Sequence, residues 1–202
     1  MCEECEVGMW EEEQICPICR RSSRYGKRHE YCHGDMEGLT CLWAYEGIAR
    51  KIIGEAKYKY FFDELKTLVK FDDRVEFFEF RKFLEEKPVV VPVPLHLKRF
   101  NERGFNQAEV IAKLVASSWK LEVRNLLSRT KDTKQQVGRE KEERLNAMEG
   151  AFATSPQPLP KILERGILLV DDVWTTGATM SECAKVLKKG GFSKVWGFVL
   201  AR

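Results

Sequence analysis

Two adjacent carboxylates follow an apolar run in the last third of the chain. The run covers residues 167–170, Asp171 and Asp172 come directly after it, and a turn rich in hydroxyl groups follows at 175–179. Ligands of open α/β sheets bind beyond the carboxyl ends of the strands, so both carboxylates should emerge at a binding edge. Carboxylates in that position can accept hydrogen bonds from the vicinal hydroxyls of a sugar.

The turn after the acid pair has the composition of a phosphate cradle. Gly177 lets the backbone approach a ligand closely, and three threonines, Thr175, Thr176 and Thr179, supply hydroxyl donors. A helix that starts here would add free N–H groups and the positive end of its dipole. Strand-end and N-cap roles would explain any two of these features, whereas the whole string predicts a site for a phosphorylated sugar.

The stretch 170–179, Val-Asp-Asp-Val-Trp-Thr-Thr-Gly-Ala-Thr, resembles the 5-phosphoribosyl 1-diphosphate (PRPP) motif of type I phosphoribosyltransferases. The resemblance implies that Asp171 and Asp172 hold the ribose hydroxyls and are the catalytic candidates, and that Mg²⁺ binds together with PRPP. It further implies that the 5′-phosphate lies in the turn made by Thr175, Thr176, Gly177, Ala178 and Thr179. Trp174 replaces the smaller residue often found there, which leaves the contacts of its ring open.

A second stretch, residues 91–107, resembles the hallmark of the ComF family, a branch linked to natural transformation. Residues 133–152 follow that family's order as well, and the resemblance covers roughly residues 38–202. It implies single-stranded DNA and the DNA-uptake machinery as partners, besides a phosphoribosyl ligand. The first cysteine pair of the family's usual double zinc ribbon is missing.

The second stretch contains the residues expected to meet a diphosphate. A rigid strand-end loop presents them: Pro94, Leu95, His96, Lys98 and Arg99. Loop N–H groups and cations neutralise clustered oxygens, and by resemblance this is the diphosphate loop. Further candidates for anion or nucleic-acid contact are Arg103, Asn106, Gln107, Gln136, Arg139 and Arg144, of which the first three could instead cap a helix.

Cysteines near the N-terminus have the spacing of metal ligands. Cys16-x-x-Cys19 and His29-x-x-Cys32 together would make a tetrahedral zinc site of three thiolates and one imidazole. The competing set joins Cys2 and Cys5 to the first of these pairs. Either site is closed and therefore structural. A basic cluster at 20–28 stands beside it and fits either nucleic-acid phosphates or a solvated loop.

Alternating apolar elements predict the fold. Strands are expected near 38–45, 89–91, 121–123, 167–170 and 194–200, and helices near 48–56, 61–69, 107–118 and 180–189, with a loop at 95–106. Strand–helix alternation favours a mostly parallel sheet flanked by helices. The prediction is therefore an α/β, type I phosphoribosyltransferase-like domain over residues 38–202, preceded by a small zinc-binding, ribbon-like module over residues 1–37.

Composition and charge narrow the setting. The formal net charge is +3, and the basic excess falls in 96–146, where anionic ligands are expected. No stretch reaches the roughly 18 apolar residues that suggest a membrane span, and the acidic, cysteine-bearing start is unlike a signal peptide. The protein is expected to be cytoplasmic.

Three functions remain compatible with the sequence. The first is an enzyme that transfers the phosphoribosyl group to a nitrogen base, the second a non-catalytic accessory protein that binds single-stranded DNA during uptake, and the third a ligand-sensing regulator. No base-binding hood is recognisable, so the sequence leaves the nucleophile, the retention of catalysis and the oligomeric state open.

Overall fold

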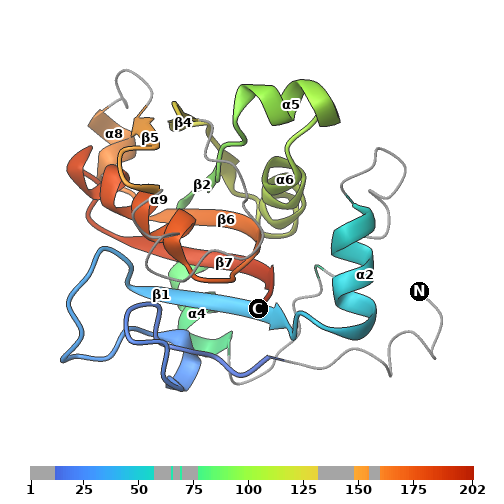
Figure 1. Cartoon of the computed structure of the whole chain (residues 1–202). Coiled ribbons are helices and arrows are strands. Elements are labelled where there is room, and N and C mark those ends of the chain that lie inside the picture. The colour runs from blue at the N-terminus through green and yellow to red at the C-terminus, as the bar shows by residue number, and fades with distance from the viewer. Residues whose placement is uncertain (1–11, 57–64, 66–68, 70–76, 132–147, 155–159) are drawn as a thin grey trace.

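The computed structural model of the protein describes residues 12–56, 65, 69, 77–131, 148–154 and 160–202. A five-stranded parallel sheet in the order β1-β7-β6-β2-β3 forms its centre (Figure 1). Its strands are β1 (Gly38–Trp43), β2 (Val89–Pro92), β3 (Glu122–Val123), β6 (Ile167–Val173) and β7 (Val195–Ala201). The predicted α/β fold with a mostly parallel sheet is confirmed.

The central strand β6 shows why these residues form a sheet buried on both faces. Its first four residues have no exposed surface, and successive side chains point to opposite sides. Ile167 and Leu169 enter one hydrophobic core. Leu168 and Val170 enter the other. The continuous apolar run that predicted this strand therefore reflects two cores rather than one.

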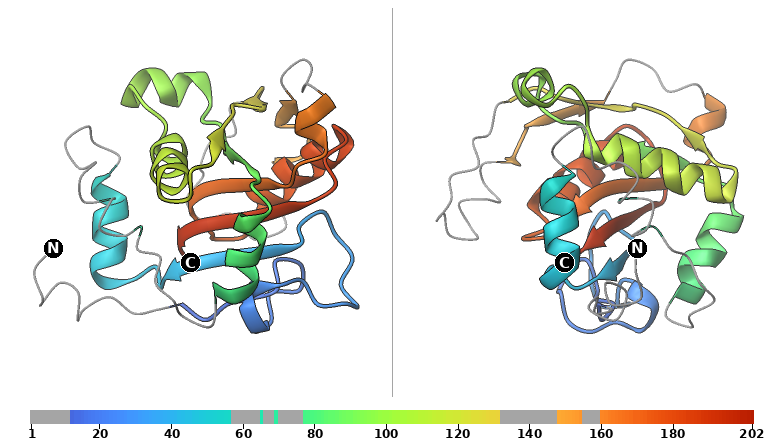
Figure 2. Two further views of the ribbon diagram at one scale, coloured as in Figure 1. Left: turned by 180° about the vertical axis from the view of Figure 1, so that it is seen from behind. Right: turned by 90° about the vertical axis from the view of Figure 1, so that its right-hand side faces the viewer.

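Helices cover both faces of the sheet. The described ones are η1 (Arg24–Gly26), α2 (Gly47–Glu55), α4 (Phe78–Glu85), α5 (Leu97–Arg103), α6 (Gln107–Trp119), α8 (Pro160–Leu163) and α9 (Ala178–Lys189). α6 packs on β2 and β6, and α9 contacts β6 and β7 (Figure 2). Within the described ranges, no helix has the length and apolar character needed to cross a bilayer.

Four of the described helices, η1, α4, α5 and α8, were not predicted from the sequence, and α4 and α5 are the longest of them. α4 lies in a charged stretch to which no element was assigned, yet Phe80 and Phe83 are buried, and Phe80 stacks on Phe198 at 5.7 Å. α5 replaces the expected loop at 95–106. It buries no residue, so no apolar stripe signals it. Its ends are set instead by the N-cap His96 and by Gly104, whose φ of 77° is left-handed.

The helix expected at 61–69 falls largely outside the described residues. Of its apolar stripe, Leu65 is described as buried, and it belongs to the core that contains α4 and α6. The remaining predicted helices, α2, α6 and α9, are confirmed within a few residues of their expected bounds.

The order of the strands reverses between β2 and β6. β2 continues through α6 to β3 on one side, whereas β6 continues through α9 to β7 on the other. β2 and β6 are themselves neighbours, with Pro92 opposite Val170. Because the two chains leave in opposite directions, a crevice opens beyond the carboxyl ends of these strands, where α/β proteins bind ligands.

An antiparallel ribbon stands apart from the main sheet. β4 (Leu127–Arg129) pairs with β5 (Phe152–Thr154), and Arg129 lies opposite Phe152. Residues 132–147, between the two strands of the ribbon, lie outside the described residues.

The N-terminal segment 12–37 packs along β1, at one edge of the sheet. The side-chain amide of Gln14 donates to the carbonyl of Cys41 at 2.8 Å and accepts from its N–H at 3.1 Å, which substitutes for a neighbouring strand. Ile15 and Met36 are buried in the same core as β6. The division of the chain into a module over 1–37 and a domain over 38–202 stays a prediction.

A substitution at Gly26 tests how the N-terminal segment 12–37 packs along β1. Gly26→Ala is expected to lower the free energy of unfolding by about 1–3 kcal/mol, because the φ of Gly26 is +71° and a Cβ would lie 2.0 Å from the carbonyl oxygen of Leu39. Urea unfolding measures the change. Gly54→Ala in α2 is the matched control, since nothing lies within 4 Å of its Cβ. Equal stability of the two variants would contradict the close approach to β1.

Candidate functional site

A cavity of about 200 Å³ occupies the crevice between the ends of β2 and β6. It is lined by the loop after β2, α5, the start of α6, and the end of β6 with the turn after it, together with Tyr45 after β1, Ile53 of α2 and Arg129 of β4. Its polar side chains are Tyr45, Arg99, Arg103, Asn106, Gln107, Arg129, Asp171, Asp172, Thr175 and Thr179. The site therefore brings together segments that are separated by about half of the chain.

Both carboxylates of the acid pair face this cavity. Asp171 and Asp172 lie at the end of β6 and are partly exposed. Asp171 Oδ1 accepts from the N–H of Asp172 at 2.9 Å, and Asp172 Oδ1 accepts from the N–H of Val173 at 2.8 Å. Each carboxyl group has further acceptor capacity beyond this one bond. The pair is thus fixed by its own backbone and can receive hydrogen bonds from a ligand.

The surroundings of Asp171 oppose its ionisation. Burial raises the pKa of Asp171 well above the usual range of an aspartate, and the charge of neighbouring Asp172 raises it further, while Arg129 acts in the opposite direction. A carboxyl group of this kind holds its proton longer than an exposed one. A cation or a set of hydroxyl donors at the site would favour the ionised form.

The turn after the acid pair has the conformation that its glycine permits. Gly177 has a left-handed φ of 72°, and α9 begins directly after it. A Cβ at Gly177 would lie 2.2 Å from the Trp174 ring. Trp174 is buried, and its ring packs against Gly177 of the turn. The contacts of this ring were left open by the sequence. Thr175 and Thr179 line the cavity.

Guanidinium groups face the acid pair across the cavity. Arg99 and Arg103 come from α5, and Arg129 comes from β4. Sequence reasoning missed Arg129 because the polar segment around it carries no strand signal. Tyr45, just beyond β1, was missed as a lining residue for a similar reason: it had been read as part of the strand itself.

The predicted diphosphate loop divides between two surfaces. Pro94, Leu95 and Arg99 line the cavity. His96 and Lys98 lie instead in a separate, shallow hollow on α5. His96 Nδ1 accepts from the N–H of Lys98 at 3.3 Å, which caps the helix. α5 explains this division, because successive residues of a helix face different directions.

Arg103, Asn106 and Gln107 were predicted either to contact an anion or to cap a helix, and their hydrogen bonds separate these roles. Asn106 is the N-cap, since its Oδ1 accepts from the N–H of Ala108 at 3.1 Å and its Nδ2 donates to the Val93 carbonyl at 2.9 Å. Arg103 Nη1 donates to Gln107 Oε1 at 3.1 Å. Gln107 is 4% exposed, and its Nε2 has no partner among the described residues. A ligand in the cavity could accept that hydrogen bond.

The remaining candidates for anion contact cannot be placed. Gln136, Arg139 and Arg144 lie outside the described residues. Their contribution to the site stays a prediction from the sequence.

Four side chains in the N-terminal segment form a metal-binding cluster. The ligand atoms of Cys16, Cys19, His29 and Cys32 all lie within 4.8 Å of one another. Tetrahedral Zn–S bonds of about 2.3 Å would place two sulfurs roughly 3.8 Å apart, so the cluster can hold a metal such as zinc. The preferred ligand set is thus brought together, and Cys2 and Cys5 of the competing set lie outside the described residues.

Contacts around the cluster orient its histidine. His29 Nδ1 lies 3.3 Å from Cys19 Sγ, while Nε2 lies 3.2 Å from the carbonyl oxygen of Ser22. A proton on Nε2, bonded to that carbonyl, leaves Nδ1 available to a metal. The Tyr31 ring stacks on His29 at 5.1 Å.

The cysteines of the cluster differ in how easily they ionise. Burial alone would raise the pKa of Cys16, but hydrogen bonds from backbone N–H groups, that of Cys19 foremost, outweigh it and lower the pKa to about 7. Burial and the neighbouring thiols raise the pKa of Cys32 to about 11. Crowded thiolates repel one another, and a divalent cation removes that repulsion.

Zinc content tests this cluster. Cys19→Ser is expected to release about one zinc per chain, because the cluster loses one of its four ligands. Metal analysis of the purified protein measures the loss. His33→Ala is the control, since His33 is exposed and stands outside the cluster. Full zinc content in Cys19→Ser would contradict the ligand set.

The fold and the site together define a class of protein: a parallel α/β protein with a charged ligand crevice at its switch point and a Cys₃His cluster beside its sheet. No protein-family model matches the chain. Individual proteins do match it, and their names refer to competence or to DNA utilization.

The chain is 38% identical over 119 residues to Competence protein F of Haemophilus influenzae, covering 55% of this chain and 50% of that protein. It is 28% identical over 194 residues to Competence protein ComFC of Streptococcus pneumoniae, covering 94% and 81%. Identity to the DNA utilization protein YhgH of Escherichia coli K12 is 32% over 117 residues, covering 56% and 48%.

The matched segment thus spans about half the length of the Haemophilus and Escherichia proteins. The chain is a relative of the ComF competence proteins, which confirms the family indicated by its sequence motifs.

Proposed function

We propose that the protein binds a phosphoribosyl ligand, PRPP or a ribose 5-phosphate group, between the ends of β2 and β6. The observation that carries the proposal is the cavity itself. It places the carboxylates of Asp171 and Asp172, the turn 175–179 and the guanidinium groups of α5 around one volume. A phosphorylated pentose supplies hydroxyl groups for the two carboxylates and a phosphate for the turn. PRPP also supplies a diphosphate for the guanidinium groups.

Each part of the ligand has a matching partner in this arrangement. The acid pair accepts hydrogen bonds from the two ribose hydroxyls. The 5′-phosphate binds the turn at 175–179, where the first N–H groups of the 12-residue helix α9 and its dipole favour an anion. Arg99 and Arg103 meet the diphosphate, because a guanidinium donates two parallel hydrogen bonds to phosphate oxygens.

The residues present also fit a magnesium ion bound together with PRPP. Mg²⁺ prefers oxygen ligands and is commonly held by one or two carboxylates with the phosphates of a substrate. Asp171 and Asp172 supply such carboxylates at the cavity wall. When bound, Mg²⁺ supplies positive charge for the diphosphate oxygens.

Transfer of the phosphoribosyl group would follow from the same geometry. A nitrogen nucleophile forms a bond to the anomeric carbon, the bond from that carbon to the diphosphate oxygen breaks, and diphosphate leaves with the electron pair. Arg99 and Arg103 stabilise the charge that accumulates on the leaving group. We assign Asp172 to the position beside the reacting carbon and Asp171 to the ribose hydroxyls.

The relatives favour a setting in DNA uptake. Proteins similar to this chain are named for competence and for DNA utilization. We propose that this chain acts in the handling of DNA that enters the cell. As a second candidate function, the cavity binds phosphoribosyl groups without turnover, and the protein is an accessory that binds single-stranded DNA.

The acid pair provides the sharpest test of ligand binding. Replacing both residues, Asp171→Asn with Asp172→Asn, is expected to weaken PRPP binding with Mg²⁺ by at least a factor of about 100, since the two charged hydrogen bonds are together worth roughly 3–6 kcal/mol. Titration calorimetry measures the affinity. Glu164→Gln, on the exposed surface away from the cavity, is the matched control. Unchanged affinity in the double variant would refute the site.

Turnover separates the two candidate functions. Diphosphate release is assayed with PRPP, Mg²⁺ and either a panel of nitrogen bases or single-stranded DNA. Release that depends on one acceptor supports transfer. Binding without release, together with DNA affinity that falls steeply with salt, supports the accessory protein.

The raised pKa of Asp171 predicts how ligand binding depends on pH. Affinity for PRPP with Mg²⁺ should increase as pH rises through that pKa, because only the ionised carboxylate accepts hydrogen bonds at both oxygens. The phosphates of the ligand titrate in every variant, so the difference between the unaltered chain and Asp171→Asn isolates this residue. Parallel pH profiles would contradict the assignment.

Stability of the ligand-free chain should show the opposite trend. The folded state binds the Asp171 proton more tightly than the unfolded state, so this residue's contribution to stability declines as pH rises from the unfolded pKa to the folded one. Asp171→Asn should therefore be at least as stable as the unaltered chain at alkaline pH. Thermal unfolding across pH measures this.

A further inference from the structure

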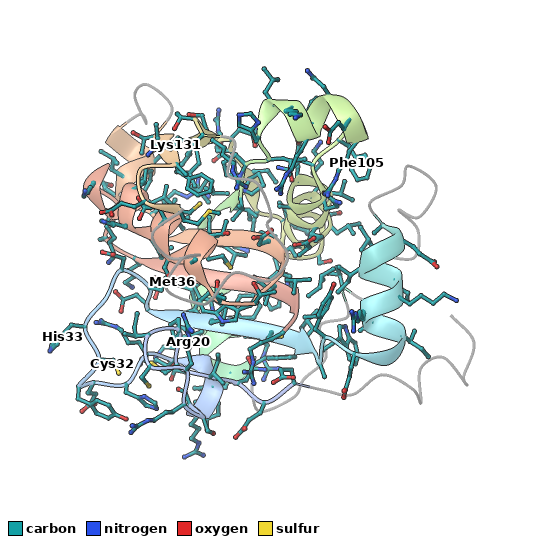
Figure 3. All side chains as sticks on the ribbon, viewed as in Figure 1. Arg20, Cys32, His33, Met36, Phe105 and Lys131 are labelled. Atoms are coloured by element: carbon teal, nitrogen blue, oxygen red, sulfur yellow. The ribbon has the colours of Figure 1, made fainter. Side chains whose placement is uncertain are left out.

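The metal cluster and the phosphate turn are connected by a single side chain. Arg20 directly follows the ligand Cys19, and its Nη2 donates a hydrogen bond to the carbonyl oxygen of Thr176. The two residues are 156 positions apart in the chain. Figure 3 labels Arg20 and Cys32 together in the N-terminal segment, next to β1. The basic cluster beside the cysteines thus contains a residue that reaches the turn at 175–179, next to the cavity-lining Thr175.

The backbone around Arg20 sets the direction in which its side chain leaves the N-terminal segment. Its φ of 64° is left-handed, which is uncommon for a residue with a side chain. Its N–H donates to the carbonyl of Cys16 at 2.9 Å, and the N–H of Cys16 donates to the carbonyl of Arg21 at 2.9 Å. Such a conformation persists only where the surroundings fix it. Ligation through Cys16 and Cys19 would fix it here.

The acceptor lies at the critical position of the turn. Thr176 stands between Thr175, which lines the cavity, and Gly177, whose conformation starts α9. A trans peptide points its N–H opposite to its C=O, so a bond that holds the Thr176 carbonyl also sets the direction of the Gly177 N–H. Arg20 therefore controls one of the donors of the phosphate turn from outside the cavity.

On these contacts, and on the function proposed above, we propose that Arg20 is a positioning residue that links the metal cluster to the phosphate turn. Metal binding at the cluster orders the turn for a phosphate, and a phosphorylated ligand in the turn strengthens metal binding in return. The reciprocity follows because both ligands favour the same arrangement of one connecting element.

Other contacts keep the N-terminal segment docked when Arg20 is replaced. Gln14 is hydrogen-bonded to β1 through Cys41. Glu37 forms an ion pair with Lys188 of α9 at 3.3 Å. Removal of the Arg20 guanidinium should therefore loosen the turn without detaching the segment.

Amide hydrogen exchange at residues 175–179 tests the link without any ligand. Arg20→Met keeps the apolar stem and removes the donor, and it should speed exchange in this turn roughly five- to tenfold, the scale of a typical coupling between sites. Arg20→Lys, which keeps a cationic donor, should recover part of the protection. Arg21→Met is the matched control, because Arg21 is exposed.

Zinc removal from the full chain and the Arg20→Met substitution together make a thermodynamic cycle of one ligand and one mutation. A chelator should speed exchange at 175–179 in the unaltered chain but add little in Arg20→Met, because both changes interrupt the same connection. Additive effects, no effect of Arg20→Met, or an equal effect of Arg21→Met would overturn the inference.

The ligand measurement distinguishes this inference from the proposed function. Arg20→Met should weaken PRPP binding with Mg²⁺ roughly five- to tenfold, and PRPP should slow zinc transfer to a chelator in the unaltered chain but not in Arg20→Met. If the unaltered chain binds PRPP and Arg20→Met binds it equally well, the link fails while the proposed function stands. If the unaltered chain does not bind PRPP, the proposed function fails, and the exchange data alone decide whether Arg20 positions the turn.

Discussion

The adjacent pairing of β2 and β6 is the constraint on which the site depends. Register places Pro92 opposite Val170, so the loop that leads to α5 and the acid pair emerge at the same edge. Because β2 then turns toward α6 and β6 toward α9, neither connection covers the other. A shift of two residues in this register would carry Asp171 away from Arg99. The close packing of the two cores fixes the register, since a slip of one residue would exchange the side chains of β6 between them.

The two adjacent carboxyl groups are costly to ionise together. Asp171 is only partly exposed, and its desolvation together with the charge of Asp172 raises its pKa well above the usual range of an aspartate. Arg129 relieves part of this strain from across the cavity. Packing alone would favour an amide at position 171, so the acid pair is not accounted for by the stability of the fold.

Sequence patterns predicted the elements whose signal is a buried face. β6 was predicted from a continuous apolar run, and α6 from apolar residues at helical spacing. α5 and β4 lacked that signal, because α5 buries no residue and only Leu127 of β4 is buried. The acid pair and the phosphate turn were recognisable from local order alone. Arg129 could not be found, since its place at the cavity depends on an antiparallel ribbon closed by residues far along the chain.

The inferred link through Arg20 would give the metal cluster a role beyond holding a short segment together. Residues 12–37 already have anchors on the sheet, among them the buried side chains of Ile15 and Met36 and the amide of Gln14. A metal needed only for docking could be replaced by a few more apolar contacts of this kind. Apolar contacts cannot hold a left-handed residue rigidly beside a metal-bound sulfur such as that of Cys19. Arg20 directly follows the ligand Cys19 and has this left-handed conformation. Its side chain donates a hydrogen bond to the carbonyl of Thr176.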